Sequence, residues 1–194
     1  GYSLTNAHFN YIGTYTAVGH ASAYTGTSPN QHGVIGNNWY DKNLKKSIYC
    51  VDDATYSSVG TNSNSGKKSP KRMVTTTITD QVRLGQNMRG KSIGIAIKDR
   101  SSVLPAGHTA TGAYWYEGKD ENKWITSSYY MDELPTWVKD FNSNNKVDDY
   151  LSKPWKTLYP IDSYTQSLID NNPYEGTFIG ETSPTFPHNL PMLR

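Results

Sequence analysis

Residues 91–100, with the sequence KSIGIAIKDR, constrain the fold more than any other part of the chain. The continuous apolar run at 93–97 is typical of a strand that is buried on both faces of a sheet. The segment before it opens with Ser69-Pro70, which predicts a helix there because proline is favoured in a first helical turn. A helix followed by a buried strand indicates an α/β fold with a largely parallel central sheet flanked by helices.

Shorter elements are predicted on both sides of that strand. The apolar face of the preceding helix would consist of Met73, Val74, Ile78, Val82 and Leu84. The other predicted elements are a helix at 16–25, a strand at 47–51, a turn after Arg100, two strands joined by the polar segment 117–123, a helix capped near Asp132 and a short helix at 146–153. From Pro154 onward, Pro, Tyr, Asn and Gly dominate, which indicates surface decoration or a segment that needs a partner surface.

Composition excludes several classes of function. The net charge of +2 and the pI of about 8.5 are too mild for a nucleic-acid partner. No apolar run is long enough to span a membrane. Cys50 is the single cysteine, so an internal disulfide and a cysteine-based metal cluster are excluded, and we expect it to be a buried apolar residue.

Thr16 lies at the start of the helix predicted at 16–25, and either Thr14 or Thr16 would be its N-cap. A hydroxyl at that position lies beside unpaired backbone N–H groups and the positive end of the helix dipole, which attract anions. A plain capping threonine is the commoner case. A nucleophilic threonine needs a base or a metal ion to ionise its hydroxyl.

Lys98 and Arg100 follow the apolar strand, and ligands of α/β sheets collect beyond the carboxyl ends of strands. Two cations separated by one residue could hold an oxyanion there, with arginine offering a planar fork and lysine a point charge. A solvated, charged strand end is the alternative.

Three segments together resemble the alkaline phosphatase superfamily: TAVGHASAYTGTSPNQHGVIGNNWYD at 16–41, KDRSSVLPAGH at 98–108 and YYMDELPTWVKDFN at 129–142. Within it the chain is similar to bacterial threonine-dependent alkaline phosphatases, relatives of the nucleotide pyrophosphatase/phosphodiesterases. In that family an asparagine follows the nucleophilic threonine by twenty-one residues, as Asn37 follows Thr16 here. The resemblance thus implies Thr16 as nucleophile and Asn37, Lys98 and Arg100 as phosphate-binding residues.

The resemblance also implies an alkaline-phosphatase-like α/β fold with an irregular, aromatic-rich insertion. Residues 1–194 would be one partial catalytic domain, with a core at 1–112 and an insertion or decorating segment at 113–194. We expect the chain to be a mature form or a fragment, without its signal peptide, of a periplasmic or secreted protein.

The implied reaction is zinc-dependent hydrolysis of small phosphate monoesters through a phosphothreonine. Two zinc ions would act, one of them binding the oxygen of Thr16. Lys98 and Arg100 favour a monoester, because a dianionic phosphate carries one charge more than a diester. The alternatives are a phosphodiesterase or nucleotide pyrophosphatase of the same superfamily, and a non-catalytic module that binds a sugar or peptide.

The metal ligands of the family, three aspartates and three histidines that include an Asp-His pair, find no match in this chain. It contains no Asp-His dipeptide, and none of the five histidines stands at a ligand position; they are His8, His20, His32, His108 and His188. We expect His20 to pack or hydrogen-bond on its helix, His32 to shape the loop that carries Asn37, and His108 to be structural. The chain is therefore expected to hold the nucleophile half of the site without the full zinc site.

Overall fold

The computed structural model describes residues 1–119 and 121–193. The chain divides into two compact units, residues 1–139 and residues 140–194. Helices and strands of the first unit are α1 (Thr16–Thr25), α2 (Pro29–His32), β1 (Asn38–Asp41), β2 (Lys46–Tyr49), β3 (Ser58–Val59), η1 (Asn64–Gly66), α3 (Ile78–Gly85), β4 (Ile93–Ala96), α4 (Asp99–Ala106), β5 (Gly112–Glu117), β6 (Lys123–Ser127) and α5 (Thr136–Ser143), which runs into the second unit. The second unit adds α6 (Lys146–Leu151), η2 (Ile161–Ser163) and η3 (Leu190–Leu193). None of the helices in these described ranges combines the length and the apolar character that crossing a bilayer requires.

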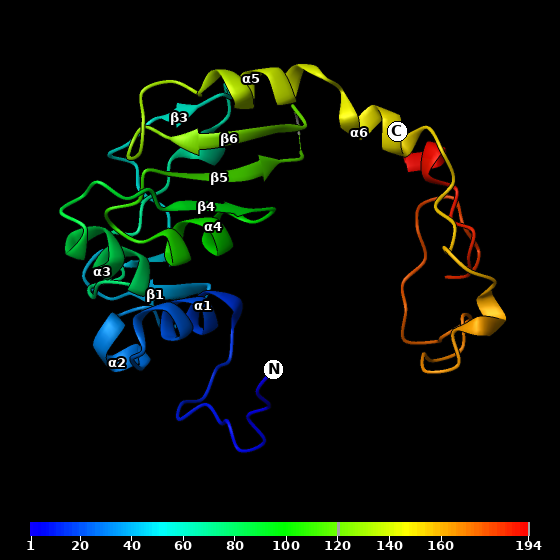
Figure 1. Cartoon of the computed structure of the whole chain (residues 1–194), viewed down its shortest axis with the longest axis horizontal. Coiled ribbons are helices and arrows are strands. Elements are labelled where there is room, and N and C mark those ends of the chain that lie inside the picture. Colours follow the sequence, from blue (N-terminus) through cyan, green and yellow to red (C-terminus); the bar gives the residue numbers. More distant parts are fainter. Residues whose placement is uncertain (120, 194) are drawn as a thin grey trace. The chain divides into compact units, whose positions relative to one another are not determined.

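Two separate sheets form in the first unit (Figure 1). The larger has the strand order β3-β6-β5-β4, and the smaller is the antiparallel hairpin β1-β2. Among the strands of the described residues, only β4 and β5 pair in parallel, with Ile93 opposite Gly112, whereas β5–β6 and β3–β6 are antiparallel. The α/β class is confirmed, but the prediction of a largely parallel sheet is wrong for the described strands. Strands β5 and β6 follow each other in the chain and pair as a hairpin, and hairpins pair antiparallel strands.

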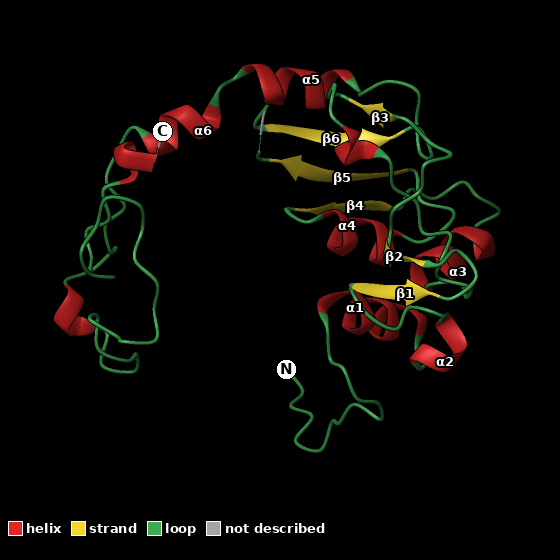
Figure 2. Ribbon diagram, turned by 180° about the vertical axis from the view of Figure 1, so that it is seen from behind, coloured by secondary structure: helices red, strands yellow, loops and turns green. Residues whose placement is uncertain are grey.

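Helix α4 lies between the larger sheet and α1 (Figure 2), because one side of it packs on β4 and β5 and the other on α1. The approach to β4 is close: a Cβ atom on Gly94 would lie 2.4 Å from the Ser102 carbonyl oxygen. The main core gathers around this helix. It contains Ala17, Ala21, Val34, Cys50, Val51, Met73, Val103, Leu104, Ala106, Ala113, Trp115 and Ile125. The expectation of a buried Cys50 is thereby confirmed.

Three predictions about local structure need correction. The strand β4 is not buried on both faces, because Ile93, Ile95 and Ile97 are about half exposed or more. The helix expected from Pro70 begins only at Ile78, after a capping box formed by Thr77 and Asp80. The turn expected after Arg100 is the helix α4, which continues through Pro105 near its end.

The second unit is held together by an aromatic cluster. The backbones of Trp155 and His188 exchange two hydrogen bonds of 2.9 Å, and the ring of Trp155 packs against Phe186.

The division of residues 1–194 into a core at 1–112 and a decorating segment at 113–194 stays a prediction.

Candidate active site

Thr16 is the first residue of α1 and is exposed to solvent. The N-cap is Tyr15, in an extended conformation, so neither Thr14 nor Thr16 caps the helix, contrary to the prediction. The hydroxyl of Thr16 is therefore not used to satisfy the first backbone N–H groups. It lies at the positive end of the helix dipole, where an anion is stabilised.

Asn37 is held against the start of this helix. Its Oδ1 atom accepts a hydrogen bond of 2.9 Å from the backbone N–H of Ala17, the neighbour of Thr16. The backbone carbonyl of Asn37 accepts another, of 2.9 Å, from Cys50 at the base of the β1-β2 hairpin. Because Oδ1 accepts this hydrogen bond, Nδ2 is the donor that the Asn37 amide can offer near the start of α1.

The chain between these two residues turns twice to make this contact. Gly26 ends α1 in the left-handed conformation, and the short α2 follows. His32 then fixes the loop: its Nδ1 accepts from Val34 N–H at 3.1 Å, and its Nε2 lies 3.0 Å from Ser22 Oγ on α1. Burial lowers the pKa of His32. The lower pKa favours the neutral imidazole, whose Nδ1 can accept the hydrogen bond from Val34. The expected loop-shaping role of His32 is confirmed.

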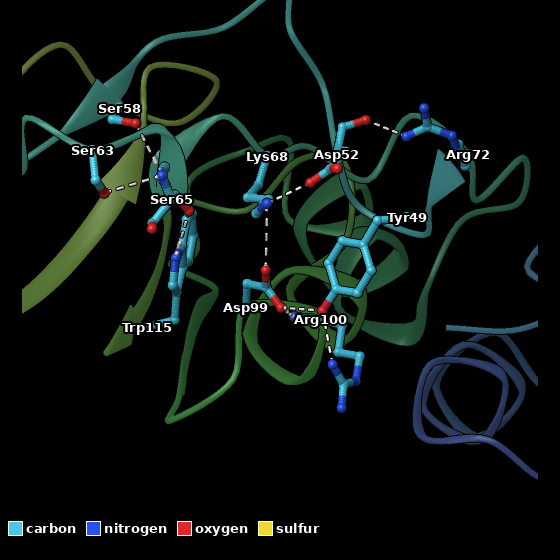
Figure 3. A network of polar contacts seen from close by, with 11 residues as sticks. Tyr49, Asp52, Ser58, Ser63, Ser65, Lys68, Arg72, Asp99, Arg100 and Trp115 are labelled. Carbon is cyan, nitrogen blue, oxygen red and sulfur yellow. Dashed lines mark hydrogen bonds and ion pairs between the residues drawn. The ribbon is translucent and has the colours of Figure 1, made fainter. Parts of the chain in front are cut away.

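Lys98 and Arg100 stand at the start of α4, directly after β4. Lys98 is the N-cap residue and is exposed, whereas Arg100 lies in the first turn and is partly buried. Arg100 Nη1 donates a hydrogen bond of 2.8 Å to the hydroxyl of Tyr49, which donates one of 2.6 Å to Asp99 Oδ1. Figure 3 shows the Tyr49 hydroxyl between Asp99 and Arg100.

Packing of α1 on α4 brings the two pairs of residues to neighbouring helix starts. His20, one turn after Thr16, has its Nε2 3.1 Å from Ser101 Oγ, the residue after Arg100. Burial and, to a smaller extent, the charge of Arg100 lower the pKa of His20. The expected packing and hydrogen-bonding role of His20 is confirmed, and Arg100 lies within electrostatic range of α1.

A cavity of about 600 Å³ opens beside the cation pair. Lys98 and Arg100 line it, together with Tyr49, Lys68, Trp115 and Glu117 among others, whereas Thr16 and Asn37 do not. The structure thus links Asn37 to Ala17, the residue after Thr16, by a hydrogen bond, and it places Lys98 and Arg100 on a common cavity. The link between the two pairs is the α1–α4 interface.

Sequence reasoning missed Tyr49, Asp99 and Lys68. Lys68 Nζ forms an ion pair with Asp52 and lies 3.6 Å from Asp99 Oδ2. Tyr49 and Asp99 are fifty residues apart, and no motif connects them. The one sequence signal for any of these three residues was the position of Asp99 between Lys98 and Arg100.

The other three histidines contact residues outside the candidate site. His8 bonds to Asn6, the carbonyl of His108 accepts from Tyr129, and His188 pairs with Glu181 inside the second unit. No group of three or more His, Cys, Asp or Glu residues that could hold a metal ion occurs within 1–119 and 121–193.

Comparison with known proteins identifies relatives of the chain. Residues 1–182 match the family model of type I phosphodiesterase/nucleotide pyrophosphatase. The chain is 48% identical to alkaline phosphatase PhoV of Synechococcus elongatus over 97% of its length, and that match covers 34% of PhoV. It is also 48% identical, over its whole length, to a protein of Myroides odoratus named calcium-transporting ATPase, of which it covers 35%.

The third relative is alkaline phosphatase PafA of Elizabethkingia meningoseptica, which is 49% identical over 97% of the chain. A crystal structure of wild-type PafA superimposes with a TM-score of 0.92 over 97% of the chain and 36% of the PafA chain. A second PafA structure, of a variant substituted at a threonine, an asparagine, a lysine and an arginine, superimposes with a TM-score of 0.93 at 45% identity. The chain spans about a third of the length of these relatives.

Proposed function

The chain belongs to the type I phosphodiesterase/nucleotide pyrophosphatase family of the alkaline phosphatase superfamily, and we propose that the whole protein is an alkaline phosphatase that hydrolyses phosphate monoesters. The observation that carries the proposal is the 2.9 Å hydrogen bond between Ala17 N–H and Asn37 Oδ1. It holds the Asn37 amide at the start of the helix that begins with Thr16, where the helix dipole is positive. That combination suits a phosphoryl group under attack.

In the proposed reaction, Thr16 Oγ1 attacks phosphorus and the bond between phosphorus and the ester oxygen breaks. The alcohol leaves, and a phosphothreonine remains. Water then attacks the same phosphorus, so that phosphate departs and the Thr16 hydroxyl is restored. Asn37 Nδ2 donates to a non-bridging oxygen in both steps, and Lys98 and Arg100 offset the charge of the phosphoryl oxygens.

The substituted PafA variant supports the assignment of these four residues to the site. Its substituted threonine and asparagine are twenty-one residues apart, and its lysine and arginine are two apart. In this chain Asn37 likewise follows Thr16 by twenty-one residues, and Arg100 follows Lys98 by two.

For the whole protein we propose a dependence on two zinc ions, as the resemblance implies. The residues described in 1–119 and 121–193 do not fit such a pair, since they contain no cluster of three potential ligands. None of the steps above is therefore routed through a metal ion. Restoration of activity by zinc after chelation of the whole protein tests this dependence. We also propose a periplasmic or secreted location, which fractionation of cells would test.

The decisive experiment is hydrolysis of an aryl phosphate monoester by the whole protein and its Thr16→Ala variant. We expect kcat to fall by at least about a thousandfold, because the nucleophile is lost. Thr14→Ala, an exposed threonine two residues earlier, is the matched control and should retain the rate.

An unchanged rate in Thr16→Ala would show that the mechanism is wrong. Faster hydrolysis of a bis-aryl phosphate than of the monoester would identify a phosphodiesterase instead. Absence of any phosphatase activity in the zinc-loaded whole protein would favour a binding module.

A further inference from the structure

The hydroxyl of Tyr49 uses its proton and its oxygen on two different neighbours. It donates to Asp99 Oδ1 at 2.6 Å and accepts from Arg100 Nη1 at 2.8 Å. Burial, and then the hydrogen bond to Asp99, raise the pKa of Tyr49, so the phenol keeps its proton at alkaline pH. Tyr49 is the last residue of β2, which places the start of α4 in contact with the β1-β2 hairpin.

Asp99 is fixed on both of its oxygen atoms. Oδ1 accepts the backbone N–H of Arg100 at 2.6 Å, and Oδ2 lies 3.6 Å from Lys68 Nζ. The side chains of Lys68 and Asp99 are only 13% and 16% exposed, so this ion pair is little screened by solvent. Lys68 also pairs with Asp52, which ties the network to the loop after β2 (Figure 3).

The contact that holds the guanidinium of Arg100 is thus a neutral phenol. A carboxylate in direct contact would offset the charge of the arginine more strongly than the phenol, which restrains the guanidinium and keeps the Asp99 carboxylate on its own far side. Burial alone lowers the pKa of Arg100, but the hydrogen bond to Tyr49 and the nearby Asp99 outweigh that effect and raise it.

One edge of the guanidinium is left for a ligand. Nη1 is bound to Tyr49, and Nε, on the opposite edge with Nη2, is buried without a hydrogen-bond partner in the described part of the chain. A buried donor without a partner is destabilising, and an oxygen acceptor would relieve this. The Nε–Nη2 edge matches two phosphate oxygens in a bidentate contact.

We propose that Tyr49, itself anchored by Asp99, is a positioning residue that holds Arg100 with its Nε–Nη2 edge toward the substrate phosphate and thereby strengthens the preference for monoesters. This inference rests on the proposed phosphatase function. Tyr49 does not touch the substrate and acts only through Arg100. Its effect should therefore disappear when Arg100 is absent.

The test is a double-mutant cycle on the whole, zinc-loaded protein with Tyr49→Phe, Arg100→Ala and the double variant. The phenylalanine keeps the ring and removes the two hydrogen bonds. We expect Tyr49→Phe to lower kcat/KM for an aryl phosphate monoester about tenfold, as loss of a hydrogen bond to a charged group does. For a methyl aryl phosphate diester, which lacks one charge, the loss should be about twofold or less.

In the Arg100→Ala background the same change should alter monoester hydrolysis by less than about twofold. Tyr24→Phe is the matched control, because Tyr24 lies at the far end of α1 and its side chain is partly exposed. It should retain the wild-type rates with both substrates. If Tyr49→Phe does not fold, Asp99→Asn takes its place in the same cycle, since it removes the carboxylate that anchors the phenol.

Three results would overturn the inference: wild-type kcat/KM in the variant, equal losses with monoester and diester, or the same loss with and without Arg100. A Thr16→Ala variant measured in parallel separates this inference from the proposed function. If Thr16→Ala is inactive and the cycle shows no coupling, the function stands and the role of Tyr49 is wrong. If Thr16→Ala is active, the function itself is wrong.

Discussion

Asn37 illustrates how one side chain can serve structure and chemistry at once. Its oxygen is bound to the helix start, and its nitrogen is the donor proposed for phosphate. Asn37→Ala should lower kcat/KM of the whole protein about a hundredfold, as removal of one oxyanion donor does. Asn37→Asp keeps the acceptor for Ala17 but replaces the donor with a negative charge, so its activity should be at least as low.

Steady-state kinetics and thermal unfolding of both variants check this prediction. The unfolding midpoint of Asn37→Asp should stay nearer to wild type than that of Asn37→Ala, because Ala17 N–H keeps its acceptor. Asn43→Asp, which adds the same charge in the exposed turn between β1 and β2, is the control. Wild-type activity in Asn37→Asp would rule out the proposed donor.

Asp53 gives the protein a predictable response to acid. Its carboxylate is 2% exposed and accepts from Ser69 Oγ at 2.6 Å and Lys71 Nζ at 2.5 Å. Burial alone would raise the pKa of Asp53, but these hydrogen bonds and that from Thr55 hold it well below the ordinary value. The resulting stability is present above the unfolded pKa of about 4 and is lost as the pH falls toward the folded pKa.

Asp53→Asn should therefore lower the free energy of unfolding at pH 7 by about 1–3 kcal/mol. It should also reduce the further loss of stability between about pH 5 and pH 3, where the unfolded carboxylate begins to take up its proton. Urea unfolding at several pH values measures both effects, with the exposed Asp140→Asn as control. An unchanged slope of stability against pH would contradict the assignment.

The residues of the candidate site differ in how far the sequence predicts them. Thr16 and Asn37 are close in the chain, and their separation matches a known family, so resemblance could identify both. The contact of Tyr49 with Asp99 and Arg100 arises where a hairpin meets a helix fifty residues later. Local pattern carries no information about such a contact, because packing of distant elements creates it.

At the scale of elements, the boundaries of helices followed capping chemistry more closely than apolar periodicity. The predicted bounds of α1, 16–25, were correct although its predicted N-cap was wrong, and Gly26 terminates the helix in the left-handed conformation. Pro70 is a weaker signal than the capping box of Thr77 and Asp80, so α3 begins eight residues later than Pro70. A turn was predicted after Arg100, yet these residues form α4, which has Pro105 in its last turn.

The capping box of α3 should be a measurable source of stability. Thr77 Oγ1 accepts from Asp80 N–H at 3.1 Å, and Asp80 Oδ2 accepts from Thr77 N–H at 2.9 Å. Thr77→Ala should cost about 1–2 kcal/mol, whereas Thr77→Ser keeps the hydroxyl and should cost less than half of that. Chemical denaturation gives both values, and Thr76→Ala at the exposed neighbouring position should be nearly neutral. Equal losses for alanine and serine at position 77 would show that the cap contributes nothing.

At the scale of the whole molecule, the sequence predicted the α/β class but not the exposure of its sheet. A run of apolar residues in a strand does not reveal which faces are covered, because burial depends on the neighbours of that strand. The second unit shows the same limit: Trp155 and His188 are joined across thirty-three residues, and no periodicity marks the contact.

The outer strand β4 leads to a prediction about association. It lies at one edge of the larger sheet, and Ile93, Ile95 and Ile97 are 49%, 58% and 68% exposed. An apolar edge strand with unpaired backbone groups is a template for pairing with another chain. We therefore expect the 194-residue chain to self-associate as its concentration rises, and Ile95→Lys to weaken this association about tenfold or more by placing a charge on the edge.

Sedimentation velocity over a range of concentrations measures the effect. Leu44→Lys adds the same charge at an exposed apolar side chain in the β1-β2 turn, away from the edge of the larger sheet, and should leave association unchanged. A wild-type chain that is monomeric at every concentration would show that this edge does not pair. Equal behaviour of the two lysine variants would assign any association to net charge instead, because only the position of the lysine distinguishes them.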